Sequence, residues 1–128
     1  ARVGLLDFQD AQPSHILYDL VSLIYDARRD VSPSVQKALL DVARKETKLA
    51  DFDTAIAALL AQRSLRIIGV FARLWLRDGK AGYLQLLPRV FGHLDIALSH
   101  PTLGDLRDTL SGMKRPTPET LEQIRALR

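Results

Sequence analysis

At 128 residues, with 47% hydrophobic and 26% charged residues, the chain has the composition of one soluble globular domain or of part of one. The absence of cysteine excludes disulfide bonds and thiolate chemistry, and a net charge of +3 is too small to indicate a nucleic-acid partner by itself. No uninterrupted apolar run approaches the ~18 residues of a membrane span, so we expect a soluble, cytoplasmic protein without a membrane partner.

The first predicted element is a strand over residues 3–8, VGLLDF, which is short and apolar on both faces. The rest of the chain has a helical pattern, which begins with apolar residues at helical spacing over about 15–27. Ser32 is a good N-cap and Pro33 suits the first helical position, so a second helix should begin there and end near Lys48. Its apolar residues are expected to face inward: Val35, Leu39 and Val42.

A long helix is predicted over about 53–78, with Gly79 placed to end it. A short helical turn over GYLQLL and helices over about 88–99, 102–110 and from 118 onward complete a mainly α chain.

The long helix is apolar around most of its circumference, which predicts a central position in the domain. Its narrow polar stripe contains Val70 and four arginines: Arg63, Arg66, Arg73 and Arg77. Two interpretations of this stripe are open. Either solvent covers it, or it faces a cleft and binds a carboxylate or phosphate, which arginine takes as a bidentate fork.

In the stretch VGLLDFQDAQ, the predicted apolar strand would present the carboxylate of Asp7 at its end. Such a position suits a magnesium ligand in phosphoryl transfer, because the sheet behind a strand end is rigid. The pattern alone is weak, since many strands end in Asp at an ordinary turn. The histidines have no paired spacing and are expected to be ordinary core or surface residues: His15, His93 and His100.

Longer segments carry a family resemblance. LLDFQDAQPSHILYDLVSL resembles the metal-binding segment of the aminoglycoside phosphotransferase family, the protein-kinase-like small-molecule kinases. Its matching elements are Asp7-Phe8, Asp10, Pro13 and Tyr18-Asp19-Leu20. IYDARRDVSP and QRSLRIIGVFARLWLRDGKAGYLQLLPRVFGHL resemble one subfamily more closely, the cell-wall-recycling kinases that phosphorylate the anomeric hydroxyl of N-acetylmuramate and N-acetylglucosamine. The resemblance covers most of residues 3 to 103.

The resemblance implies a mainly α fold, the helical C-terminal lobe of a protein-kinase-like fold with one N-terminal β-strand. It also implies ATP and magnesium as cofactors, and it aligns Asp7 with the metal-binding aspartate of the family. Asp10 either adds to the metal shell or caps the turn. Asp19 matches an aspartate that braces the catalytic loop, so we expect it to be buried in a supporting role rather than exposed.

The same resemblance implies that residues 1–128 are a single partial domain. Residues 1–12 would be a metal-binding strand and turn, and residues 13–128 a helical substrate lobe. The nucleotide-binding lobe and the catalytic loop with its base would lie upstream and are absent from this sequence. We therefore expect the full-length protein to be an ATP-dependent phosphotransferase and the 128-residue chain alone to be inactive. A lobe without its partner should expose apolar surface and self-associate.

The acceptor sugar would need a cation, because N-acetylmuramate carries a lactyl carboxylate. The candidate arginines follow the first helix or belong to the long helix, with Arg28 and Arg66 first: Arg28, Arg29, Arg63, Arg66 and Arg73. Trp75 and Phe71 could stack on a sugar ring, but aromatic residues in an apolar stripe are more often part of the core.

Three other functions stay open. The acceptor could be an aminoglycoside or another small molecule of the same family. A strand without a partner would also suit a helical protein-interaction module. A nucleic-acid-binding module would need a clustered basic face with interleaved aromatic residues, whereas this chain spreads its charge.

Overall fold

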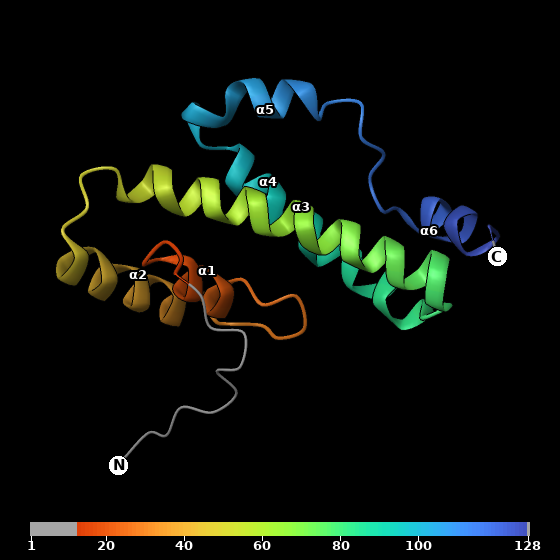
Figure 1. Ribbon diagram of the computed structural model, residues 1–128, viewed down its shortest axis with the longest axis horizontal. Helices are drawn as coiled ribbons and strands as arrows, with labels where there is room; N and C mark the ends of the chain where they lie inside the picture. The colour runs from red at the N-terminus through yellow and green to blue at the C-terminus, as the bar shows by residue number, and fades with distance from the viewer. Residues whose placement is uncertain (1–12, 128) are drawn as a thin grey trace, which may run out of the picture.

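The computed structural model describes residues 13–127, which form helices arranged around one long helix (Figure 1). In chain order these are α1 (Tyr18–Ile24), α2 (Pro33–Thr47), α3 (Phe52–Asp78), the 3-10 helix η1 (Ala81–Leu86), α4 (Leu87–Leu98), the 3-10 helix η2 (Pro101–Leu103), α5 (Gly104–Thr109) and α6 (Pro118–Arg125). The predicted mainly α fold is confirmed. The strand expected over residues 3–8 lies outside the described residues.

The long helix α3 is the centre of the fold, as its apolar circumference predicted. Its most extensive contact is with α4, and α1 and η1 pack against it as well. In Figure 1, α1 and α2 lie on one side of α3, α5 lies on the other, and α6 lies by its C-terminal end. Of the arginines in the polar stripe of α3, Arg63 is half-buried, whereas the others are exposed: Arg66, Arg73 and Arg77.

Two clusters of buried side chains hold these helices together. The first joins α1, α3 and α4: Val21, Ile24, Tyr25, Leu60, Ala61, Leu94, Ala97 and Leu98. The second joins the C-terminal part of α3 to η1 and α4: Ala27, Phe71, Trp75, Leu84, Leu87, Val90 and Phe91. The expected place of Phe71 and Trp75 in the core is therefore confirmed. Trp75 also donates a hydrogen bond of 2.9 Å from its Nε1 to the carbonyl of Ile124, which fixes α6 to α3.

The helix ends follow their sequence signals. The Ser32 hydroxyl accepts a hydrogen bond of 3.4 Å from the backbone N–H of Val35, and Pro33 occupies the first position of α2. At the C-terminal end of α3, the capping residue Gly79 has a left-handed φ of 67°. Its N–H donates to the carbonyl of Trp75 at 2.9 Å. Both boundaries were predicted because capping chemistry is local.

Two expectations about the first helices are wrong. α1 spans Tyr18–Ile24 and is shorter than the range 15–27, because the chain before it forms a turn in which His15 Nδ1 accepts from the N–H of Leu17 at 3.2 Å. Val35 and Val42 do not face inward but are 48% and 61% exposed. Apolar periodicity shows which face of a helix is apolar, but it does not show what covers that face.

α3 is long and apolar enough to cross a membrane when only its length and composition are considered. This is weak evidence, because the core helix of a soluble protein passes the same test. The contacts of α3 with α4, η1 and α1 are those of a core helix.

Candidate functional site

The predicted metal ligands Asp7 and Asp10 lie outside the described residues. Within residues 13–127, no group of three or more histidine, cysteine, aspartate or glutamate side chains is arranged to hold a metal ion. The described residues therefore supply no metal centre of their own, and the magnesium site at Asp7 stays a prediction.

Asp19 lies in the first turn of α1, next to Tyr18. Its side chain is exposed, so the expectation that it is buried is wrong for the described part of the chain. A short amphipathic helix exposes part of its circumference unless another element covers it, and α1 packs against α3 with Val21 and Ile24 instead. Its role in bracing a catalytic loop stays a prediction.

The arginines of residues 13–127 fall into two groups. Those of the first group form ion pairs with nearby carboxylates: Arg44, Arg77, Arg89, Arg107, Arg115 and Arg125. Those of the second group have no ion pair within the described part of the chain: Arg28, Arg29, Arg63, Arg66 and Arg73. The second group consists of the arginines that charge and stripe geometry selected for substrate binding. A cation without a carboxylate partner is free to receive an anionic ligand.

Two of these arginines gather around one tyrosine ring. Arg63 and Arg66 lie one turn apart on α3, and Tyr18 is on α1, which packs against that helix. The guanidinium of Arg63 lies over the Tyr18 ring, 5.9 Å from its centroid. Arg66 Nη1 donates a long hydrogen bond of 3.5 Å to the Tyr18 hydroxyl. Tyr18 thus holds two positive groups on the same side of α3.

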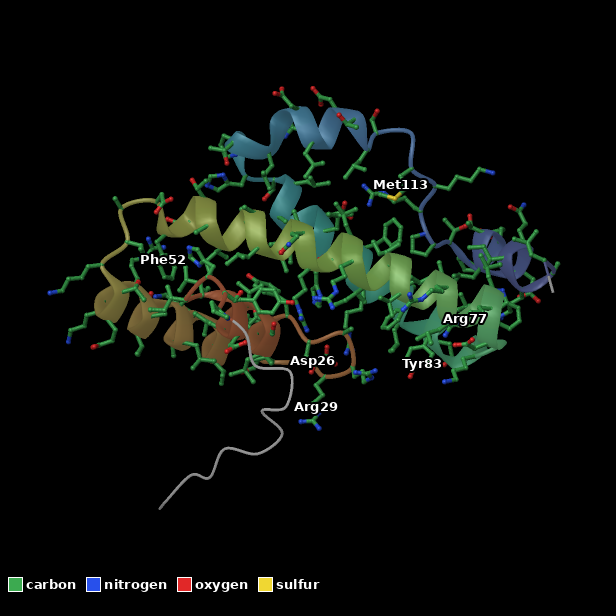
Figure 2. The ribbon with its side chains drawn as sticks, viewed as in Figure 1. Asp26, Arg29, Phe52, Arg77, Tyr83 and Met113 are labelled. Carbon is green, nitrogen blue, oxygen red and sulfur yellow. The ribbon has the colours of Figure 1, made fainter. Side chains whose placement is uncertain are left out.

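Arg28 contacts a different ring. Its guanidinium lies 5.9 Å from the centroid of Tyr83, whose ring packs against Phe71 at 5.1 Å. The backbone N–H of Arg28 donates to the carboxylate of Asp26 at 2.6 Å, which fixes the turn after α1. Figure 2 shows Arg29 in the same loop, beside Asp26 and directed away from the helices. Arg28 and Arg29 therefore lie on the exposed loop and not at Tyr18.

His93, a half-buried histidine of α4, lies close enough to Arg63 to be affected by its charge. The ring of His93 on α4 meets the ring of Tyr25 edge-on, with centroids 5.4 Å apart. Burial lowers the pKa of His93, and the positive charges of Arg89 and Arg63 lower it further against the opposite effect of Asp30 and Asp26. His93 is therefore a partly buried residue in an aromatic contact, in agreement with the expectation of an ordinary core or surface residue, although local sequence patterns did not predict Tyr25 as its neighbour.

Two grooves of the described chain lie apart from the arginines that have no ion pair. A groove of about 310 Å³ lies between α3 and α4 and is lined mostly by apolar residues such as Ile56, Leu60 and Ile96. Another of about 420 Å³ lies between α4 and α5, and its wall carries the ion pair of Arg115 and Asp95 at 2.8 Å. Neither is lined by an arginine without an ion pair.

Curated relatives decide the family. The chain is 46% identical over 110 residues to an N-acetylmuramate/N-acetylglucosamine kinase of Caulobacter vibrioides, a match that covers 84% of this chain and 30% of the relative. Kinases of the same name from Pseudomonas aeruginosa and Pseudomonas putida are 37% and 31% identical, over 86% and 87% of this chain and 36% of each relative. The chain belongs to the family of these kinases. No family model matches it.

The resemblance to the cell-wall-recycling kinases is thereby confirmed. The chain spans about a third of the length of the curated kinases that it matches, between 30% and 36%. What it shares with them is therefore one region of a longer kinase.

Proposed function

We propose that the full-length protein is an ATP-dependent sugar kinase and that this chain is its acceptor-binding helical part. The enzyme would transfer the γ-phosphate of ATP to the anomeric hydroxyl of N-acetylmuramate or N-acetylglucosamine in the cytoplasm. The observation that carries the proposal is the 46% identity to a kinase named for these two sugars. The arginines without an ion pair support it, because one of these sugars is an anion.

Residues of this chain would divide the work between metal and substrate. Asp7, with Asp10 beside it, would hold magnesium, which neutralises charge on the transferring phosphate. Asp19 would support the catalytic loop, and its exposed carboxylate is accessible to such a contact. The cations of the acceptor pocket would come from one set of arginines: Arg28, Arg29, Arg63, Arg66 and Arg73. The catalytic base would lie upstream, so the 128-residue chain alone would be inactive.

The test is ADP release by the full-length protein with N-acetylmuramate, N-acetylglucosamine, an aminoglycoside and choline as separate acceptors. We expect turnover with the amino sugars, and its loss in Asp7→Ala. Asp105→Ala is the matched control, because Asp105 is an exposed carboxylate on α5 and should leave turnover unchanged. Turnover with the aminoglycoside alone would show that the protein is a phosphotransferase of the same family with an aminoglycoside, rather than an amino sugar, as its acceptor. Full activity of Asp7→Ala would remove the metal site from the proposal.

A further inference from the structure

Arg63 has an unusual environment for a charged side chain. It is half-buried, and its Nε is enclosed without a hydrogen-bond partner. Within the described part of the chain, its guanidinium has the Tyr18 ring as a neighbour and no ion pair. Buried polar groups are nearly always paired, so a guanidinium held in this state calls for an explanation. An anion bound to the terminal nitrogens, Nη1 and Nη2, would compensate the charge of the guanidinium, although the enclosed Nε would still have no hydrogen-bond partner.

The surroundings of Arg63 add positive charge rather than cancel it. Arg66 is one turn along α3 and is tied to the same tyrosine by its contact with the Tyr18 hydroxyl. Across from them on α4, Arg89 is paired with Asp30 at 2.9 Å, so this carboxylate is already engaged. Both guanidinium groups contact Tyr18, so their like charges repel each other, and an anion bound to both would relieve that repulsion.

The two sugars in the names of the relatives differ in charge. N-acetylmuramate carries a lactyl ether that ends in a carboxylate, whereas N-acetylglucosamine has a hydroxyl at that position and is neutral. A pocket that takes both needs a cation for the first sugar only. Arginine binds a carboxylate through two parallel hydrogen bonds, which gives geometric selectivity as well as charge.

We propose that Arg63 and Arg66, held by Tyr18, form the carboxylate subsite of the acceptor pocket and set the preference for acidic over neutral amino sugars. This inference rests on the proposed function and narrows its set of arginines. From the sequence, Arg28 and Arg66 were the first candidates for binding the carboxylate. The structure favours Arg63 over Arg28, because Arg28 lies on the exposed loop against Tyr83. Tyr18 is then a positioning residue, whose ring and hydroxyl fix the two guanidinium groups.

A structural role for Arg63 is the competing explanation. A carboxylate from another part of the full-length protein could pair with it and stabilise the fold. Loss of that pair would impair both sugars alike and lower the melting temperature. Loss of a carboxylate subsite would impair only the acidic sugar.

The experiment measures kcat and KM of the full-length protein for N-acetylmuramate and N-acetylglucosamine in Arg63→Met, Arg63→Lys, Arg66→Met and Tyr18→Phe. We expect Arg63→Met to raise the KM for N-acetylmuramate about 10- to 100-fold, the range for a lost hydrogen bond to a charged group. The KM for N-acetylglucosamine and both kcat values should stay within about twofold. Arg63→Lys should recover part of the loss, because it keeps the charge without the fork.

Tyr18→Phe keeps the ring under Arg63 and removes the hydroxyl that Arg66 contacts, so its effect should resemble a weak form of Arg66→Met. Arg125→Met is the matched control. Arg125 is an exposed arginine of α6 paired with Glu122 at 3.0 Å, and its loss should leave both KM values unchanged.

Calorimetric titration of the same proteins with each sugar separates failure of the subsite from failure of the proposed function. If the wild type binds N-acetylmuramate but does not phosphorylate it, the function falls, and the subsite is judged by weaker binding in Arg63→Met. The subsite is overturned if Arg63→Met and Arg63→Lys bind N-acetylmuramate as the wild type does, if both KM values rise equally, or if the wild type binds no N-acetylmuramate.

Discussion

His93 lies among charged groups that come from three parts of the fold. Arg63 of α3 and Arg89 of α4 oppose its protonation, whereas Asp26 and Asp30 in the loop after α1 favour it. Burial is the largest influence and also opposes protonation, so the pKa of His93 lies below its usual value. The lowered pKa means that a further positive charge next to Arg63 and Arg89 is disfavoured.

The lowered pKa of His93 makes the stability of the chain depend on pH. The ordinary pKa is 6.5, so in the unfolded chain His93 binds a proton more readily than in the folded chain. Its contribution to stability is fully present above the unfolded pKa and is lost as the pH falls through the folded pKa. Between about pH 7.5 and about pH 5.5, His93→Gln should therefore lose less stability than the wild type in urea titrations.

The control for this pH dependence is Gln62→Ala, which changes an exposed side chain of α3 without a titratable group and should keep the wild-type difference between the two pH values. An equal loss of stability in His93→Gln and in the wild type would show that other groups control the titration.

Single residues were predicted unevenly from the sequence. The arginines proposed from the sequence as anion ligands are those that the structure leaves without an ion pair. For Arg63 and Arg66 the reason is local, since no carboxylate lies three or four residues away on α3 to pair with either. The sequence did not show which of these arginines lie together. Arg63 and Arg66 are positioned by the ring of Tyr18, which precedes Arg66 by 48 residues. Contacts of this kind follow from the packing of α1 on α3, which local patterns do not determine.

At the scale of elements, the ends of helices were more predictable than their partners. Ser32 and Pro33 start α2 as expected, because a cap depends only on neighbouring residues. The same helix contributes no buried residue, and its Leu39 and Leu40 only partly cover the first core cluster. Periodicity predicts which face of a helix is apolar. Whether that face is buried depends on packing against other elements, which local sequence patterns do not predict.

Gly69 within α3 and Gly79, the residue that caps α3, should respond in opposite directions to alanine. Gly79 has a φ of 67°, where a Cβ is strained, so Gly79→Ala should destabilise the chain by about 1 kcal/mol. Gly69 is exposed within the helix, and a Cβ there would meet no atom within 4 Å. Gly69→Ala should therefore stabilise the chain by about 0.5–1 kcal/mol. Urea unfolding followed by circular dichroism measures both. Destabilisation by Gly69→Ala would contradict the open surroundings of Gly69, and stabilisation by Gly79→Ala would contradict the left-handed conformation at the end of α3.

At the scale of the whole molecule, exposed apolar side chains concentrate at the beginning of the described chain. Ile16 and Leu23, before and within α1, are 69% and 58% exposed, and Val35 and Val42 of α2 are 48% and 61% exposed. Figure 1 draws both helices on the same side of α3. Because these exposed apolar residues belong to elements on one side of α3, we expect this side of the molecule to contact other protein.

The exposed apolar residues of α1 and α2 lead us to expect that the 128-residue chain self-associates as its concentration rises. Val42→Lys should weaken this association at least about tenfold, because a charge would be removed from water at the contact. Light scattering coupled to size-exclusion chromatography over a series of concentrations measures the effect. Ile96→Lys is the matched control, since Ile96 is also an exposed apolar residue, at 54%, but belongs to α4. A monomer at every concentration would contradict the association itself. An equal effect of both substitutions would show that hydrophobicity in general, and not the side of the molecule formed by α1 and α2, drives it.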